Sequence, residues 1–211
     1  MTLALRAVVF DYGRVLTGPP DAAAHAELVR ISGLQADCLD ALYWADRRAY
    51  DEGKLNGPGF WRKITRDAGL SLSQQTIDEL NLWDQRMWTL GDPVMLQWQL
   101  ALKRHGLLTA ILSNMGDSVH EHMVRELPWL SRFEVLVWSY QLGVTKPDPA
   151  IYRFTLEKLG TQPAETLFLD DRRENVATAV AMGMKGLVFS SVEKLREDLK
   201  ESGLARELPL P

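Results

Sequence analysis

The sequence predicts an α/β fold: a doubly wound, mostly parallel sheet with an α-helical cap inserted near its start. From residue 91 onward, short apolar runs alternate with helical patterns, and this alternation is typical of parallel strands joined by right-handed crossovers. Between residues 18 and 90 only helical patterns occur. We therefore expect a core of residues 1–17 and 91–211 and a cap of residues 18–90.

The first strand is expected at Ala7–Phe10, an unbroken apolar run of the kind that a parallel sheet covers on both faces. Asp11 follows at the carboxyl end of this strand, the edge at which open α/β sheets bind ligands. Gly13 is expected to let the chain turn sharply and to leave a backbone carbonyl accessible. An aspartate that only caps a loop would give the same pattern, so this stretch alone assigns no function.

The cap is expected to contain four helices, because helical spacing of apolar residues is broken only by Gly, Pro and Ser clusters such as Asn56-Gly57-Pro58-Gly59. The predicted helices are Ala22–Ile31, Ala36–Tyr50, Phe60–Ala68 and Gln74–Met87, the last with Ser73 as its N-cap. Four of the seven tryptophans lie in this segment: Trp44, Trp61, Trp83 and Trp88. This pattern favours the core of a small helical bundle over an aromatic ligand site.

The core elements follow in order after Asp92-Pro93, which resembles an N-cap with proline at the first helical position. The predicted strands are Leu108–Leu112, Phe133–Trp138, Thr166–Leu169 and Gly186–Phe189. The predicted helices are 93–105, Ser118–Glu126, Pro149–Leu159 with Asp148 as its cap, Arg173–Met182, and a last one to Glu201 with a capping box of Ser190 and Glu193.

Composition excludes several classes of protein. Apolar content of 46% and charged content of 25% are those of an ordinary globular chain, and a net charge of −4 without a basic cluster indicates no nucleic-acid partner. The single cysteine, Cys38, excludes an intrachain disulfide framework and favours a reducing compartment, which we expect to be the cytoplasm. No signal peptide or membrane-spanning run is apparent. The oligomeric state stays open.

Polar residues gather at the predicted strand ends and in one loop, and these ends meet at one edge of the sheet. They are Asp11, Ser113-Asn114, Lys146 and Asp170-Asp171. Each has an ordinary alternative, since Ser113-Asn114 and Asp170-Asp171 also suit helix caps and a lone lysine is usually solvated. Together, carboxylates at one crevice favour Mg²⁺, a lysine binds phosphoryl oxygens, and an ionised aspartate is a competent nucleophile.

With these motifs the chain resembles the haloacid dehalogenase superfamily of hydrolases over nearly its whole length. The matching stretches are Phe10–Leu16, Leu112–Asn114, Lys146-Pro147 and Leu169–Asp171. The sequence from Phe168 to Val176 is most similar to that of small sugar-phosphate phosphatases and epoxide-hydrolase-like phosphatase domains. The helical segment of residues 18–90 resembles the helical cap of that branch.

The resemblance implies a Mg²⁺-dependent phosphomonoesterase that acts on a small phosphorylated metabolite through an aspartyl-phosphate. The resemblance implies that Asp11 is the nucleophile and that Asp11, the Gly13 carbonyl and Asp171 hold Mg²⁺. Support comes from Asp170 and Asn175. Ser113, Asn114 and Lys146 hold the phosphate, and Lys146 also takes part in catalysis.

Gly13 departs from the family pattern, because most of its phosphatases have there a second aspartate that moves a proton. We therefore expect a preference for esters with acidic leaving groups, unless a cap acid such as Asp46 or Glu52 delivers the proton. A metal-independent 2-haloacid dehalogenase also lacks that aspartate, but the Asp170-Asp171 pair favours the phosphatase. A non-catalytic phosphate-binding or regulatory protein is the third alternative.

Overall fold

The computed structural model describes residues 4–208 and 210 and confirms the predicted α/β class. Five parallel strands form one sheet in the order β3-β2-β1-β4-β5. They are β1 (Ala7–Phe10), β2 (Leu108–Ser113), β3 (Val135–Trp138), β4 (Thr166–Asp170) and β5 (Lys185–Val188). The chain winds outward from β1 first in one direction and then in the other. The crevice of such a sheet opens at this reversal, at the carboxyl ends of the strands.

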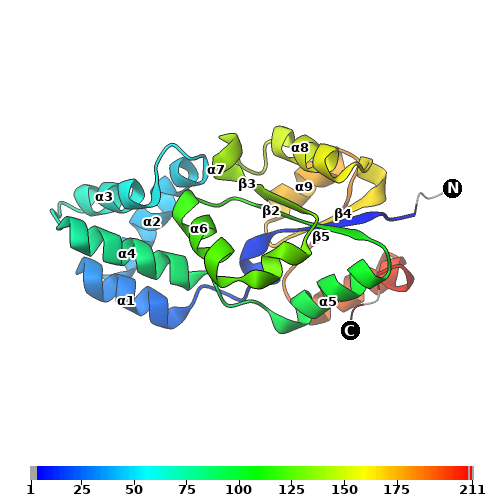
Figure 1. The fold of residues 1–211 in the computed structure, drawn as a ribbon, viewed down its shortest axis with the longest axis horizontal. Helices are drawn as coiled ribbons and strands as arrows, with labels where there is room; N and C mark the ends of the chain where they lie inside the picture. Colours follow the sequence, from blue (N-terminus) through cyan, green and yellow to red (C-terminus); the bar gives the residue numbers. More distant parts are fainter. Residues whose placement is uncertain (1–3, 209, 211) are drawn as a thin grey trace.

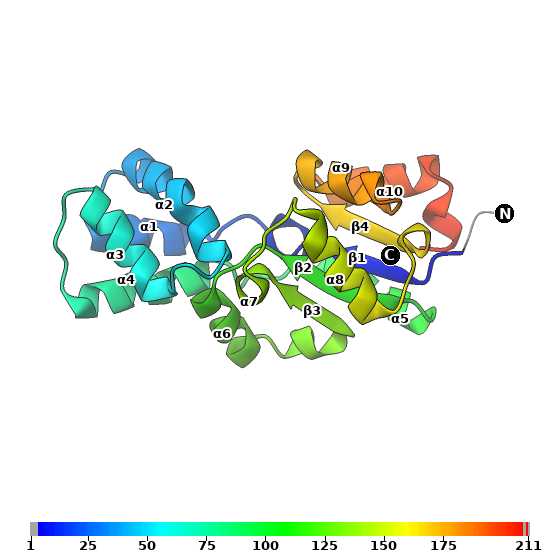
Figure 2. The same cartoon turned by 90° about the horizontal axis from the view of Figure 1, so that it is seen from above.

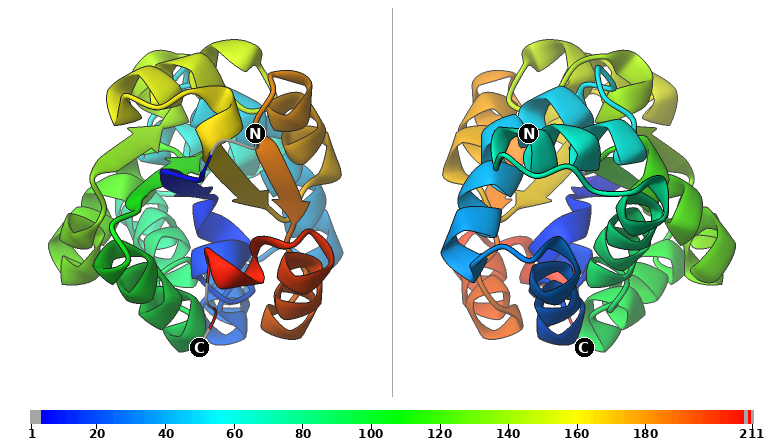
Figure 3. Two further views of the ribbon diagram at one scale, coloured as in Figure 1. Left: turned by 90° about the vertical axis from the view of Figure 1, so that its right-hand side faces the viewer. Right: turned by 90° about the vertical axis from the view of Figure 1, so that its left-hand side faces the viewer.

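Helices cover both faces of the sheet, as the left view of Figure 3 shows. One face carries α8 (Pro149–Leu159) and α9 (Arg173–Ala181), and the other carries α5 (Pro93–Arg104) and α10 (Val192–Glu201). Successive β1 side chains alternate between the two layers: Val9 packs with the α8–α9 layer, whereas Val8 and Phe10 pack with the α5–α10 layer. Burial on both faces explains the unbroken apolar run of β1.

The cap helices form a separate group beyond the carboxyl ends of the strands (Figures 1 and 2). They are α1 (Ala22–Ser32), α2 (Ala36–Asp51), α3 (Gly57–Asp67) and α4 (Gln74–Met87). Thr17 and Gly91 pair in an isolated antiparallel bridge, so the two connections to the core lie side by side at the predicted boundaries of the cap. The division into two domains that move against each other stays a prediction. None of the described helices is long and apolar enough to cross a membrane.

The cap touches the core through glycines that permit close approach. The remaining core helices are α6 (Asp117–Glu126) and α7 (Ser139–Leu142). A β-carbon on Gly116, just before α6, would lie 2.1 Å from the ring of Tyr50 in α2. The Gly57 N–H donates to Asp117 Oδ1 at 2.9 Å, and the Ser139 hydroxyl donates to the Asp51 carbonyl at 2.6 Å. These contacts hold the end of α2 against the core.

Some predicted boundaries are wrong for identifiable reasons. Helix α3 begins at Gly57 rather than Phe60, because Asn56 caps it through the Gly59 N–H and Pro58 suits its first turn. The capping box of Ser190 and Glu193 is also wrong, since the N-cap of α10 is Ser191, whose side chain accepts from the Lys194 N–H.

The tight contact at Gly116 predicts a cost for any side chain there. Gly116→Ala places a methyl group inside the Tyr50 ring, and such overpacking typically costs about 1–3 kcal/mol. The free energy of unfolding in urea is therefore expected to fall. Gly18→Ala is the matched control, because a β-carbon at Gly18 meets nothing within 4 Å. Equal stability of both variants and the parent would refute the close packing of cap on core.

Candidate active site

Lys146 is the centre of the polar cluster at the strand ends. Its Nζ donates to Asp11 Oδ1 at 2.8 Å, to Asp170 Oδ2 at 2.6 Å and to the Leu112 carbonyl at 2.8 Å. The side chain is 1% exposed. Because a buried ammonium is stable only with such partners, burial and the two carboxylates together fix its position, and the carboxylates raise its pKa despite the burial.

Asp11 directs one carboxylate oxygen into the protein and leaves the other free. Oδ1 accepts both the Lys146 ammonium and the Tyr12 N–H, the latter at 2.7 Å, whereas Oδ2 makes no hydrogen bond within residues 4–208 and 210. Its backbone N–H donates to the Leu169 carbonyl of β4 at 2.8 Å. Burial raises the pKa of Asp11 to about 7; Lys146 opposes this rise, and the charges of Asp170 and Asp171 add to it.

The two aspartates at the end of β4, Asp170 and Asp171, differ in their contacts. Asp170 is fully buried: Oδ2 binds Lys146, and Oδ1 accepts the Arg172 N–H and the Asn175 amide, each at 2.9 Å. Asp171 is half-buried and makes no hydrogen bond within the described residues, and burial followed by the charge of Asp170 raises its pKa. One oxygen each of Asp11, Asp170 and Asp171 lie within 4.8 Å of one another, an arrangement able to hold a metal ion.

Asn175 adds an acceptor to this carboxylate cluster. Its Nδ2 donates to Asp170, and its buried Oδ1 has no hydrogen-bond partner among the residues that the structure describes. A buried acceptor left unpaired is costly unless water or a ligand completes it. Asn175 lines the same cavity as Asp171, so this unpaired acceptor belongs to the candidate site.

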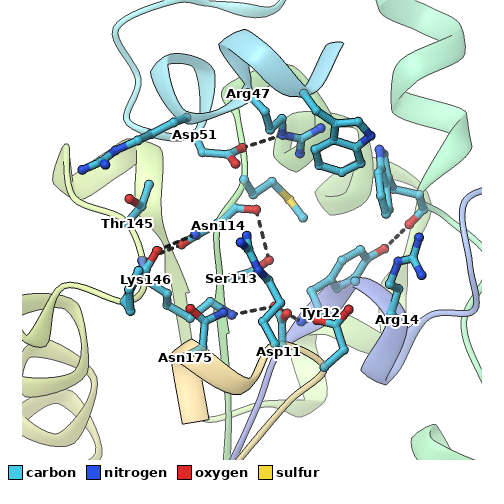
Figure 4. A pocket seen from close by; sticks show the side chains of 18 of the residues that line it. Asp11, Tyr12, Arg14, Arg47, Asp51, Ser113, Asn114, Thr145, Lys146 and Asn175 are labelled. Carbon is cyan, nitrogen blue, oxygen red and sulfur yellow. Dashed lines mark hydrogen bonds and ion pairs between the residues drawn. The ribbon is translucent and has the colours of Figure 1, made fainter. Parts of the chain in front are cut away.

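Ser113, the last residue of β2, and Asn114, the next residue, make different contacts. Asn114 Oδ1 accepts the Lys146 N–H at 2.8 Å and Nδ2 donates to the Lys146 carbonyl at 3.0 Å, so its amide holds the lysine backbone. Ser113 is buried and lines the cavity, and within the described part of the chain its hydroxyl makes only a 3.5 Å contact to the Asn114 carbonyl (Figure 4). Ser113 is thus the freer of the two for a ligand, and the predicted phosphate contact of Asn114 stays a prediction.

The turn after Asp11 differs from the prediction. Gly13 has φ −65° and ψ 133°, an extended conformation open to any residue, and Arg14 takes the left-handed one with φ 62°. Gly13 therefore does not supply the sharp turn. A β-carbon at Gly13 would lie 3.6 Å from the Trp88 ring, in ordinary contact. The Tyr12 hydroxyl donates to the Trp88 carbonyl at 2.6 Å, which ties the turn to the end of α4.

A cavity of about 740 Å³ opens above these residues and reaches the cap. Its cap side is lined by residues that the motifs did not reveal: Trp44, Arg47, Arg48, Asp51 and Trp88. On α2, Arg47, Arg48 and Asp51 follow Trp44 by three, four and seven residues, a spacing that places all four on one face of the helix. This helical spacing was the sequence signal that could have revealed them. Trp44 is 55% exposed, whereas Trp61 is buried, so the bundle-core interpretation holds for one and fails for the other.

The cap acid at the cavity is Asp51, not Asp46 or Glu52. Asp46 pairs with Lys63, and Glu52 pairs with Arg48 and Lys54. Asp51 Oδ1 accepts the Arg47 Nε–H at 2.9 Å, and burial raises the Asp51 pKa while Arg47 opposes the rise. The Arg47 guanidinium itself lies over four aromatic rings at 5.3–5.9 Å, so this pair is held inside the cap.

Comparisons with known proteins assign the chain to one family of hydrolases. A model described as haloacid dehalogenase-like hydrolase matches residues 5–183. Bifunctional epoxide hydrolase 2 of Mus musculus is 31% identical over 99% of this chain, which spans only 41% of that protein. A phosphatase of Mycobacterium tuberculosis is 26% identical, with 98% of this chain and 94% of the relative covered. An (S)-2-haloacid dehalogenase of a Pseudomonas species is also 26% identical, covering 92% and 88%.

Solved structures agree on the fold. A haloacid dehalogenase family enzyme of Bacteroides thetaiotaomicron, solved in complex with magnesium and inorganic phosphate, matches with a TM-score of 0.71. The match covers 89% of this chain and 95% of the other at 23% identity, a level of similarity that supports the shared fold and no further detail.

The burial of Lys146 between two carboxylates predicts a pH-dependent cost for its removal. Lys146→Met leaves Asp11 and Asp170 buried without a cation, and breaking a buried pair in this way typically costs about 3–5 kcal/mol. The folded-state pKa of Asp11 then rises further above its unfolded value, so stability is lost as pH rises and is regained as pH falls. Urea unfolding is expected to show a larger deficit at pH 8 than at pH 5. An equal deficit at both would contradict this electrostatic origin.

Proposed function

This chain belongs to the haloacid dehalogenase-like hydrolases, and from that premise we propose that it is a Mg²⁺-dependent phosphomonoesterase acting on a small phosphorylated metabolite. One observation carries the proposal: Asp11 keeps one oxygen free toward the cavity while Lys146 and the Tyr12 N–H hold the other. A carboxylate held by one oxygen presents the second in a fixed direction, as attack in line with a leaving group requires.

The residues around Asp11 suit a phosphoryl group. In the proposed reaction, Asp11 Oδ2 attacks phosphorus, the bond to the ester oxygen breaks, and an aspartyl-phosphate forms. Water then attacks that phosphorus and restores the Asp11 carboxylate with release of phosphate. The Ser113 hydroxyl is free to donate to a phosphoryl oxygen, and the Lys146 ammonium stabilises negative charge at the reacting centre.

The donor set suits Mg²⁺. The Asp11 carboxylate, the carbonyl of Gly13 and Asp171 offer hard oxygen ligands, which Mg²⁺ prefers. When bound, the ion supplies positive charge that offsets the carboxylates and the phosphate. Asp170 keeps Lys146 in place, since both of its oxygens are already bonded within the protein.

A 2-haloacid dehalogenase is the second candidate, because Gly13 lacks a proton-transferring side chain and a dehalogenase relative aligns with 92% of this chain. Asp171 argues against it: a half-buried carboxylate beside two others serves no purpose in metal-free substitution at carbon. A purely regulatory role leaves the free oxygen of Asp11 without a function.

We expect phosphate release from ester substrates to require Mg²⁺ and to stop with EDTA. Asp11→Asn keeps the size of the side chain and removes the attacking charge, so turnover is expected to fall to background while the fold persists. Asp148→Asn is the control: Asp148 lines the cavity but caps α8, a role that asparagine also fills. Turnover of 2-chloropropionate alone, or turnover equal with and without metal, would favour the dehalogenase.

Gly13 predicts sensitivity to the leaving group. Proton delivery to a departing oxygen is typically worth ~10²–10⁴-fold, and Tyr12, the neighbouring candidate, is committed to the Trp88 carbonyl. We expect kcat/KM to fall steeply as the leaving-group pKa rises, and to fall less steeply in Gly13→Asp. Gly13→Ala is the control, because its β-carbon fits beside Trp88 without adding an acid. A shallow dependence in the parent would instead point to Asp51 or water as the proton source.

A further inference from the structure

Arg14 occupies a backbone conformation that arginine disfavours. Its φ of 62° is the only positive value among the non-glycine residues that the structure describes. The turn requires it, because the Arg14 N–H donates to Thr17 Oγ1 at 3.2 Å while the Thr17 N–H returns to the Tyr12 carbonyl. Glycine or asparagine would adopt this conformation at lower cost. Such an outlier beside a candidate site indicates a role for the arginine side chain.

Arg14 is exposed and lines the cavity of the candidate active site, where it lies beside Tyr12 (Figure 4). The other cations that line this cavity are all paired: Lys146 with Asp11 and Asp170, Arg47 with Asp51, Arg48 with Glu52, and Arg172 with Glu174. Arg14 makes no ion pair and no side-chain hydrogen bond within residues 4–208 and 210, although its charge acts on the nearby Asp171 and opposes the rise in the pKa of that carboxyl. An unpaired guanidinium in a cavity is a site for an anion, and its planar fork suits carboxylates and phosphates.

The groups assigned to the phosphoryl group leave one part of a substrate for Arg14 to meet. The transferred phosphoryl group lies against Asp11, Ser113 and Lys146, and its leaving oxygen points away from Asp11, toward the cap. Trp44 and Trp88 line that cap side, and their rings suit an organic group. Because the phosphoryl group is already served by Lys146 and the metal ligands, the cation of Arg14 remains for the organic part.

We propose that Arg14 binds a second anionic group on the leaving group, so that the preferred substrates are phosphate monoesters whose organic part carries a carboxylate or another phosphate. This inference rests on the proposed phosphatase function and adds the substrate class. It also explains why an arginine persists where the backbone favours glycine or asparagine.

Two esters differing only in that charge test the proposal: 4-carboxyphenyl phosphate and its neutral isostere 4-carbamoylphenyl phosphate. The ratio of their kcat/KM values is measured in the parent and in Arg14→Asn, so that the intrinsic difference between the leaving groups cancels. A charge-assisted hydrogen bond corresponds to a loss of at least about tenfold in this ratio in Arg14→Asn. Arg14→Lys, which keeps the charge, is expected to retain part of the ratio.

A stability measurement separates the backbone from the side chain. Asparagine tolerates the left-handed conformation, so Arg14→Asn is expected to raise the unfolding temperature by roughly 2 °C while it loses the substrate preference. Arg48→Gln is the matched control, because Arg48 lines the same cavity but is paired with Glu52; it is expected to keep the ratio of the parent.

Several outcomes would overturn the proposal. They are an unchanged ratio in Arg14→Asn, an equal loss in Arg48→Gln, a lowered unfolding temperature in Arg14→Asn, or a change in Mg²⁺ requirement alone, which would mean that Arg14 acts on Asp171. Failure of the parent to hydrolyse either ester would instead remove the phosphatase function itself. Hydrolysis of both esters without any effect of Arg14 would remove only this inference.

Discussion

The buried ammonium of Lys146 is the constraint on which the rest of the site depends. It joins two carboxylates at the carboxyl ends of the adjacent strands β1 and β4 and also donates to a carbonyl of β2. Removal of such a charge from water is costly, so the surrounding groups must be arranged to compensate it. Asp170 is fully consumed by this task. Asp11 is only half consumed, and its free oxygen is what makes the cluster chemically useful.

The same electrostatics explain why the cluster suits a cation and an anionic substrate together. Asp11, Asp170 and Asp171 outnumber the one lysine, and their repulsion adds to the burial that raises the pKa values of Asp11 and Asp171. A divalent ion relieves this excess of negative charge and creates the positive field that a phosphate requires. The carboxylates thus serve both the stability of the site and its proposed chemistry.

The cap lines one side of the cavity and is held in place by close contacts with the core. Close contacts at Gly57 and Gly116 hold the cap against α6, and the paired connections at Thr17 and Gly91 hold its base. The Trp88 ring lies beside Gly13, the position at which most phosphatases of the family carry a second aspartate. An aromatic ring is therefore next to the place that the side chain of this acid would occupy. Arg14 adds a strained backbone at the same turn. A strained backbone of this kind is more typical of ligand sites than of packed core positions.

The sequence by itself determined the fold class, the positions of all five strands to within two residues, and the cluster of Asp11, Lys146, Asp170 and Asp171, because parallel strands bring their carboxyl ends to one edge. Local patterns also located the caps at Ser73, Asp92 and Asp148. Only the tertiary structure decided that Asn114 holds the Lys146 backbone, that Asp51 rather than Asp46 or Glu52 faces the cavity, and that Arg14 rather than Gly13 bears the left-handed turn. These depend on which neighbours each residue meets once distant segments pack together. Local patterns in the sequence do not specify that packing.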